Sequence, residues 1–121
     1  MKKLSNLLLM CLIAIYCSPA LSATCEETNV KITSIRAVSE QFPQAPHKNT
    51  VELHHEMRDY CSLDACSTAN RYRVAIDGAD NHIISAAYMA FASGKPVNIF
   101  VDTNLGTRSG ICVVSYLTIA Q

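Results

Sequence analysis

Apolar and polar positions in the second half of the chain predict a strand, a helix and a strand in succession. Residues 70–77 alternate between apolar and polar side chains, which is the pattern of a half-buried strand. Residues 82–93 instead carry apolar side chains at helical spacing. Gly94 fits the left-handed position beyond a helix end and Pro96 cannot continue a helix, so we expect the helix to end there. Residues 97–101 predict the next strand.

Three further strands are predicted from the remaining pattern. Residues 30–38 are rich in β-branched side chains, and their period of two breaks near Thr33 and Ser34, which predicts a bulge or a sharp bend. Residues 50–57 alternate cleanly and predict a strand with one face in water. Residues 111–119 are mostly apolar and predict a strand well inside the sheet.

These elements predict a mainly β fold with one helix, in the order βββαββ. A five-stranded Greek-key barrel of the OB type has this order, with its helix between the third and fourth strands. We therefore expect a single OB-fold domain over residues 23–121.

Residues 1–22 have the pattern of an export signal. Two lysines near the start precede an apolar run from Leu7 to Tyr16, and residues 20–22 form a small-x-small cleavage motif. The apolar run is shorter than the roughly 20 residues that span a bilayer, so we expect no membrane insertion. We predict a signal peptide over residues 1–22 and a mature protein that is exported, either periplasmic or secreted.

Four cysteines remain after such a cleavage: Cys25, Cys61, Cys66 and Cys112. An even number in an exported domain indicates disulfide bonds. We favour Cys66–Cys112 together with Cys25–Cys61, while Cys61–Cys66 together with Cys25–Cys112 stays open as the alternative. The Cys-x4-Cys spacing has no matching second pair, which disfavours zinc. We expect no metal and no cofactor.

Charge and motifs argue against two function classes. Loss of Lys2 and Lys3 leaves eight basic and ten acidic side chains without a basic stripe, which disfavours a nucleic-acid partner. His54 and His55 are neighbours in a predicted strand, so they face opposite ways and do not readily converge on one ion. The chain has no Gly-x-Ser-x-Gly motif and no other assembled catalytic site, so we predict that it is not an enzyme.

One polar and aromatic group of residues fits ligand recognition. An aromatic ring can pack on the apolar face of a sugar, while hydroxyl and amide groups bond its hydroxyls. The alternative is a disulfide loop that leads into a strand, where small polar residues are expected in any case. The candidate residues are Tyr60, Ser62, Asp64, Asn70, Arg71 and Tyr72.

Residues 88–100, Tyr-Met-Ala-Phe-Ala-Ser-Gly-Lys-Pro-Val-Asn-Ile-Phe, resemble a segment of the binding subunits of subtilase cytotoxin and typhoid toxin, in which an aromatic-rich helix ends at a strand entry. Residues 65–67 (Ala-Cys-Ser) and 30–33 (Val-Lys-Ile-Thr) also sit where those proteins have similar stretches. The resemblance implies an exported OB-fold subunit that forms a ring of five, binds a cell-surface glycan and serves a catalytic A subunit. By position, it places Thr28 near the serine that contacts sialic acid in those families.

Two hypotheses follow from these observations. The first is a secreted, non-catalytic binding subunit, toxin-B-subunit-like and homo-oligomeric, that recognises a glycan. The second is a monomeric periplasmic OB-fold protein that binds a small molecule or an envelope protein. Met89 does not fit on the narrow buried stripe of the predicted helix, so a contact between copies would cover it only under the first hypothesis.

Overall fold

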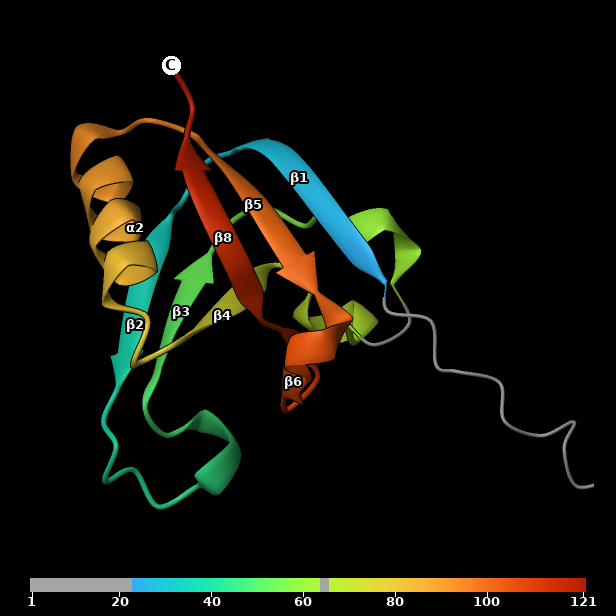
Figure 1. The fold of residues 1–121 in the computed structure, drawn as a ribbon, viewed down its shortest axis with the longest axis vertical. Coiled ribbons are helices and arrows are strands. Elements are labelled where there is room, and N and C mark those ends of the chain that lie inside the picture. Colours follow the sequence, from blue (N-terminus) through green and yellow to red (C-terminus); the bar gives the residue numbers. More distant parts are fainter. Residues whose placement is uncertain (1–22, 64–65) are drawn as a thin grey trace, which may run out of the picture.

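The computed structural model describes residues 23–63 and 66–121, which fold into two three-stranded antiparallel sheets, one α-helix and a short hairpin (Figure 1). The first sheet has the order β1 (Thr24–Val30), β5 (Val97–Asp102), β8 (Val114–Ile119). The second has the order β2 (Ser34–Val38), β3 (Thr50–His54), β4 (Arg73–Asp77). The hairpin pairs β6 (Thr107–Arg108) with β7 (Ile111–Cys112).

Helix α2 (Asn81–Ser93) connects β4 to β5 and packs beside β8 (Figure 1). Short 3-10 helices lie in the loops, at Ala45–His47, Tyr60–Ser62, Thr68–Asn70 and Thr103–Leu105. The prediction of a mainly β fold with one helix is confirmed. Within the described residues the strands form separate sheets, and none of these sheets closes into a barrel. An isolated parallel bridge joins Ala75 in β4 to Val113, which directly precedes β8.

The helix ends as its sequence predicts. Gly94 adopts a left-handed conformation with φ of 67°, and its N–H donates to the carbonyl of Phe91. The next N–H, that of Lys95, donates to the carbonyl of Ala90 at 3.0 Å. These two bonds satisfy carbonyls that the helix end would otherwise leave without partners.

The hydrophobic core lies between the two sheets and is covered on one side by α2. The helix contributes Ala87 and Ala90, whose small side chains are fully buried and allow the helix backbone to approach the strands closely. The fully buried valine, leucine and isoleucine side chains that the strands contribute to this core are Val30, Leu53, Val74, Ile76, Val97, Ile99, Val101 and Val114.

The first predicted strand is in fact two strands that belong to different sheets. β1 ends at Val30 and β2 begins at Ser34, so the turn falls where the apolar period breaks. Residues 24–29 precede the predicted strand and are mostly polar, yet they form part of β1. They do so because β1 pairs with β5 at one edge of the first sheet, where alternate side chains remain in water.

Two other expectations are corrected by the strand pattern. β8 is the last strand in the hydrogen-bonded order of the first sheet, and its side chains alternate between buried and more exposed positions, so it does not lie well inside the sheet. β3 was expected to have one wet face, yet Thr50, Val51, Glu52 and Leu53 are all buried. A charged residue in such a position requires partners, and these partners define the candidate site.

Two disulfides link the loops to the strands. Cys25 of β1 is bonded to Cys61, and Cys66 is bonded to Cys112 of β7, with Cα–Cα distances of 5.7 and 5.2 Å. This is the pairing that the sequence favoured. The expected signal peptide over residues 1–22 lies outside the described residues.

Candidate functional site

The register of the second sheet places charged side chains together on its outer face, the face that points away from the core. Arg36 of β2 and Ala75 of β4 lie directly opposite Glu52 of β3. Directly opposite residues in antiparallel strands share one face. Leu53 and its partner Val74 are in the core, so Arg36 and Glu52 must point to the other side.

Glu52 is the centre of this face and has no exposed surface. Nη2 of Arg36 donates to both carboxylate oxygens, at 2.6 and 2.7 Å, and Nη1 of Arg73 donates to Oε2 at 3.0 Å. Nδ1 of His47 and Nε2 of His54 lie 3.6 and 3.4 Å from the two carboxylate oxygens, without hydrogen-bond geometry. We call these five residues the Glu52 cluster.

The electrostatics of the cluster favour an ionised carboxylate. Burial alone would raise the pKa of Glu52, but the hydrogen bond from Arg36 and the charges of Arg73 and Arg36 outweigh it and hold the pKa below its usual value. Two guanidinium groups therefore face one carboxylate. The cluster carries a net positive charge of one even when both histidines are neutral.

An open pocket of about 480 Å³ adjoins the cluster. Residues 39–49, which connect β2 to β3, form one wall of this pocket, and hydrogen bonds from the N–H groups of Phe42 and Asn49 to the carbonyl of Ser39 close the loop on itself. Phe42 remains 40% exposed. The lining residues are Arg36, Ala37, Val38, Ser39, Phe42, Gln44, His47 and Arg73.

A second set of hydrogen bonds fixes Arg73, which lines the pocket, and Arg108 of the β6–β7 hairpin. Oδ1 of Asn70 accepts from Nη2 and Nε of Arg73, at 2.8 and 3.3 Å, and Nδ2 of Asn70 donates to the carbonyl of Ser109. Arg108 bonds Asp77 and the hydroxyl of Thr50, and thereby ties the β6–β7 hairpin to the second sheet. The side chain of Arg73 is thus held in place before any ligand arrives.

The structure brings some of the predicted ligand-binding residues near this pocket. Asn70 holds Arg73 as described, and the ring of Tyr72 contacts the ring of His54 edge-on, with centroids 5.6 Å apart. Arg71 does not line the pocket and instead forms an ion pair with Asp59 at 2.5 Å.

Other predicted residues lie elsewhere. Tyr60 is fully buried, so its ring is not available to stack on a sugar in this structure. Thr28 is exposed, but it belongs to β1 in the first sheet. Ser62 lies in the 3-10 helix at Tyr60–Ser62, and Asp64 lies outside the described residues.

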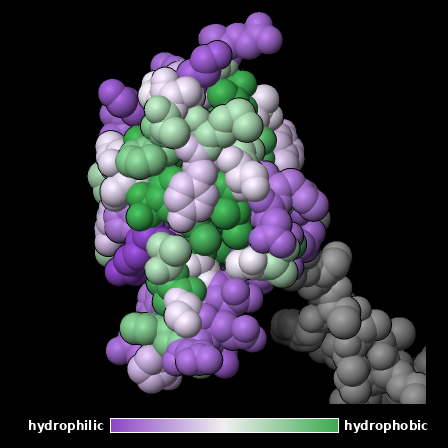
Figure 2. Space-filling view, turned by 90° about the vertical axis from the view of Figure 1, so that its left-hand side faces the viewer, coloured by the Kyte–Doolittle hydropathy of each residue, from purple (hydrophilic) through white to green (hydrophobic). Residues whose placement is uncertain are grey.

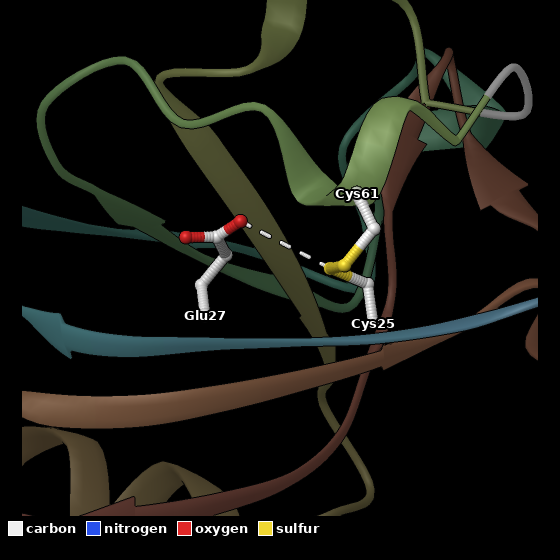
Figure 3. Close-up of side chains that lie close together, drawn as sticks. All are labelled: Cys25, Glu27 and Cys61. Atoms are coloured by element: carbon white, nitrogen blue, oxygen red, sulfur yellow. Dashed lines mark hydrogen bonds between the residues drawn. A yellow bond between two sulfur atoms is a disulfide. The ribbon is translucent and has the colours of Figure 1, made fainter.

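A group that resembles a metal site is explained by a disulfide. Sγ of Cys25, Sγ of Cys61 and a carboxylate oxygen of Glu27 lie within 4.8 Å of one another (Figure 3). Metal ligation by cysteine needs a thiolate, and both sulfur atoms are bonded to each other. The group therefore does not offer the ligands of a metal site.

Sequence reasoning did not single out Arg36, His47, Glu52 and Arg73 as a site. The alternation of residues 50–57 predicts a wet face, although a carboxylate between two arginines can be buried. The signal that could have found the site is charge complementarity between strands: Arg36 lies opposite Glu52, and Arg73 lies opposite His54, diagonally from Glu52.

Comparison with protein-family models, with curated proteins and with solved structures finds no match to this chain. The geometry of the site therefore carries the functional argument. In residues 23–63 and 66–121, α2 and the shorter helices lack the combination of length and apolar character that crossing a membrane requires.

Proposed function

We propose that this protein is an exported, non-catalytic binding module of the OB type that recognises a glycan with the outer face of β2, β3 and β4. The single observation that carries the proposal is the open pocket on this face, which combines an exposed aromatic ring with fixed polar groups. Export is supported by two disulfide bonds and by the signal-like pattern of residues 1–22.

The strand neighbours support an OB-type arrangement. β1 and β2 are consecutive, separated by three residues, and act as two halves of one bent strand: β1 pairs with β5, and β2 pairs with β3. The parallel bridge between Ala75 and Val113 lies where β4 would meet the last strand. With β1 and β2 counted as the first strand of an OB-fold, β3, β4, β5 and β8 are its second to fifth strands. The bent first strand then borders both the second strand, β3, and the fourth strand, β5.

The position of the pocket also suits this fold. OB-folds bind oligosaccharides and oligonucleotides on the face of strands two and three, between the loops that join strands one and two and strands four and five. The corresponding elements here are β3 and β4, residues 39–49, and the β6–β7 hairpin. Phe42 supplies an apolar surface for a sugar ring, and Ser39 and Gln44 supply hydroxyl and amide groups for its hydroxyls.

The chemistry of the cluster favours binding over catalysis. Glu52 is buried, accepts three hydrogen bonds from two arginines, and is held ionised, so its carboxylate is poorly placed to exchange protons with a substrate. Such a carboxylate serves to position the arginines around it.

Assembly of several copies is part of the proposal. Tyr88, Met89 and Phe91 of α2 are exposed, and Met89 is exposed by 63%. Figure 2 shows a mainly hydrophobic centre, bordered by hydrophilic residues, on the side of the molecule where α2 lies. Together with the resemblance of residues 88–100 to toxin binding subunits, this supports a homo-oligomer, pentameric by that resemblance, with a catalytic A subunit as partner.

A glycan array with the oxidised protein lacking residues 1–22 tests the proposed activity. We expect binding to a restricted set of glycans, and loss of that binding in Phe42→Ala. Met57→Ala is the matched control, because Met57 is exposed but does not line the pocket. No bound glycan with the folded protein, or equal binding by Phe42→Ala, would refute the proposal.

A further inference from the structure

The pocket beside the Glu52 cluster has an excess of positive charge. Arg36, His47 and Arg73 line the pocket, whereas Glu52 lies beneath them without exposed surface. A ligand therefore meets the two guanidinium groups before it meets the carboxylate. Since one carboxylate faces two guanidinium groups, a neutral ligand would leave one positive charge unbalanced at the pocket wall.

Arg36 still has N–H groups that can donate hydrogen bonds to a ligand. Its side chain is 52% exposed, and Nη2 alone makes both hydrogen bonds to Glu52. Among the interactions of residues 23–63 and 66–121, this leaves the Nε and Nη1 groups of Arg36 for a ligand. A planar guanidinium matches the two oxygens of a carboxylate, sulfate or phosphate group.

His47 adds an unsatisfied polar atom to the same wall. Its Nδ1 atom is buried without a hydrogen-bond partner, 3.6 Å from Oε1 of Glu52. A metal ion is a poor explanation for this nitrogen, because the two arginines already occupy the oxygens of Glu52 and would repel a cation.

We propose that the pocket is an oxyanion site, in which Arg36 contacts a carboxylate, sulfate or phosphate group carried on a sugar-sized ring that packs against Phe42. Arg73 and Glu52 are positioning residues: Glu52 orients Arg36, and Arg73 is held by Asn70. The ring part of this inference rests on the proposed glycan recognition, whereas the oxyanion part does not.

Titrations followed by backbone amide NMR shifts test the site at constant ionic strength. The probes are glucose, glucuronate, glucose 6-sulfate, glucose 6-phosphate, inorganic sulfate and inorganic phosphate. We expect the charged sugars to shift amides in residues 36–47 and around Arg73, glucose to cause no such shifts, and inorganic anions to bind more weakly than the charged sugars. Glucuronate, sulfate-bearing and phosphate-bearing probes then identify the preferred oxyanion.

Variants distinguish direct contact between Arg36 and the ligand from a long-range effect of the protein's net charge. Arg36→Gln should weaken binding of the preferred probe about tenfold, which is the scale of one hydrogen bond to a charged group. Lys95→Gln removes the same charge from an exposed position outside the pocket lining and should leave binding unchanged. The double variant Arg36→Gln with Glu52→Gln keeps the net charge and leaves no buried carboxylate without its partner, yet should still lose binding about tenfold.

The possible results distinguish this inference from the proposed function. Three results would overturn the oxyanion site. Glucose could bind as strongly as its charged derivatives, the NMR shifts could map away from the pocket, or the double variant could bind the preferred probe as strongly as the unmodified protein. Array binding of neutral glycans through Phe42, without response to oxyanions, would refute the site and retain the proposed function. Oxyanion binding that depends on Arg36, with no glycan recognised on the array, would support the site and refute the proposed function.

Discussion

The imidazole of His55 accepts a hydrogen bond at Nε2 from the hydroxyl group of Tyr60 in the interior of the protein. Nδ1 of His55 lies 2.6 Å from the carbonyl oxygen of Glu56, which can only accept, so the ring proton must be on Nδ1. Burial raises the pKa of Tyr60, so its hydroxyl keeps its proton and donates it. Burial disfavours the charged form of His55, and in the neutral form Nε2 is the acceptor of this bond.

This pair predicts a loss of stability in mild acid. Burial lowers the pKa of His55 in the folded protein from its ordinary value of 6.5, and the nearby charge of Arg58 also lowers it. Below pH 6.5 the unfolded chain binds a proton at this site more readily than the folded one, so the stability contribution is present above that pH and is lost as pH falls. Urea unfolding at pH 7.5 and 5.5 measures the effect.

His55→Gln is the matched variant for this experiment, because it keeps a polar side chain and cannot titrate. We expect the difference in unfolding free energy between the two pH values to be smaller in His55→Gln than in the unmodified protein. Equal differences in both proteins would show that His55 does not carry the pH dependence.

Tyr60 is predicted to act in stability and not in ligand binding. Tyr60→Phe keeps the buried ring but leaves Nε2 of His55 without its donor, which should cost about 1–3 kcal/mol of unfolding free energy. Binding of the preferred glycan or anion should not change at a temperature where the variant is folded. Reduced affinity of fully folded Tyr60→Phe would instead restore Tyr60 as a ligand-binding residue.

Removal of the buried carboxylate should destabilise the second sheet. Glu52→Ala leaves the mostly buried Arg73 without its counter-charge, and breaking such a pair costs on the order of 3 kcal/mol. Glu56→Gln is the control: Glu56 also pairs with an arginine but is mostly exposed, so its change should stay within about 0.5 kcal/mol. Urea denaturation of both variants at pH 7.5 provides the comparison.

The same carboxylate predicts a second, more acidic loss of stability. The pKa of Glu52 is lower in the folded protein than its ordinary value of 4.5, so its contribution is fully present above pH 4.5 and is lost as the pH falls below it. Urea denaturation at pH values below 5 should show a smaller decrease of the unfolding free energy with falling pH in Glu52→Gln than in the unmodified protein. An identical acid slope in both proteins would contradict the proposed role of the arginines.

Elements with a strong local signal could be predicted from the sequence, whereas the site could not. The end of α2 follows from Gly94 and Pro96, which act within a few residues of one another. Burial of Glu52 depends on Arg36 in β2 and Arg73 in β4, and on a sheet register that local sequence does not specify. β1 escaped prediction for the same reason, because its polar residues are ordered by pairing with β5.

The disulfide pairing can be tested directly by peptide mapping. We expect linked peptides that contain Cys25 with Cys61 and Cys66 with Cys112 in the oxidised protein. Replacement of both Cys66 and Cys112 by serine should lower the unfolding free energy, by about 4 kcal/mol in the chain-entropy account of a loop of this length. A linked peptide with Cys61 and Cys66 would support the alternative pairing instead.

Met89 provides the sharpest test of assembly, because it is the most exposed of the large apolar side chains on α2. A charged residue in the centre of an interface between copies loses its hydration without gaining a partner, whereas the same residue on a free helix surface remains in water. If the protein is a homo-oligomer through this face, Met89→Glu should reduce the native mass to that of the monomer in light scattering. If the unmodified protein is a monomer, Met89→Glu should change its unfolding free energy by no more than about 0.5 kcal/mol, as for other exposed substitutions. Lys95→Glu, just beyond the helix end, controls for added negative charge. If the unmodified protein is a monomer, the monomeric hypothesis is favoured. If it is an oligomer that Met89→Glu leaves intact, assembly does not occur through α2.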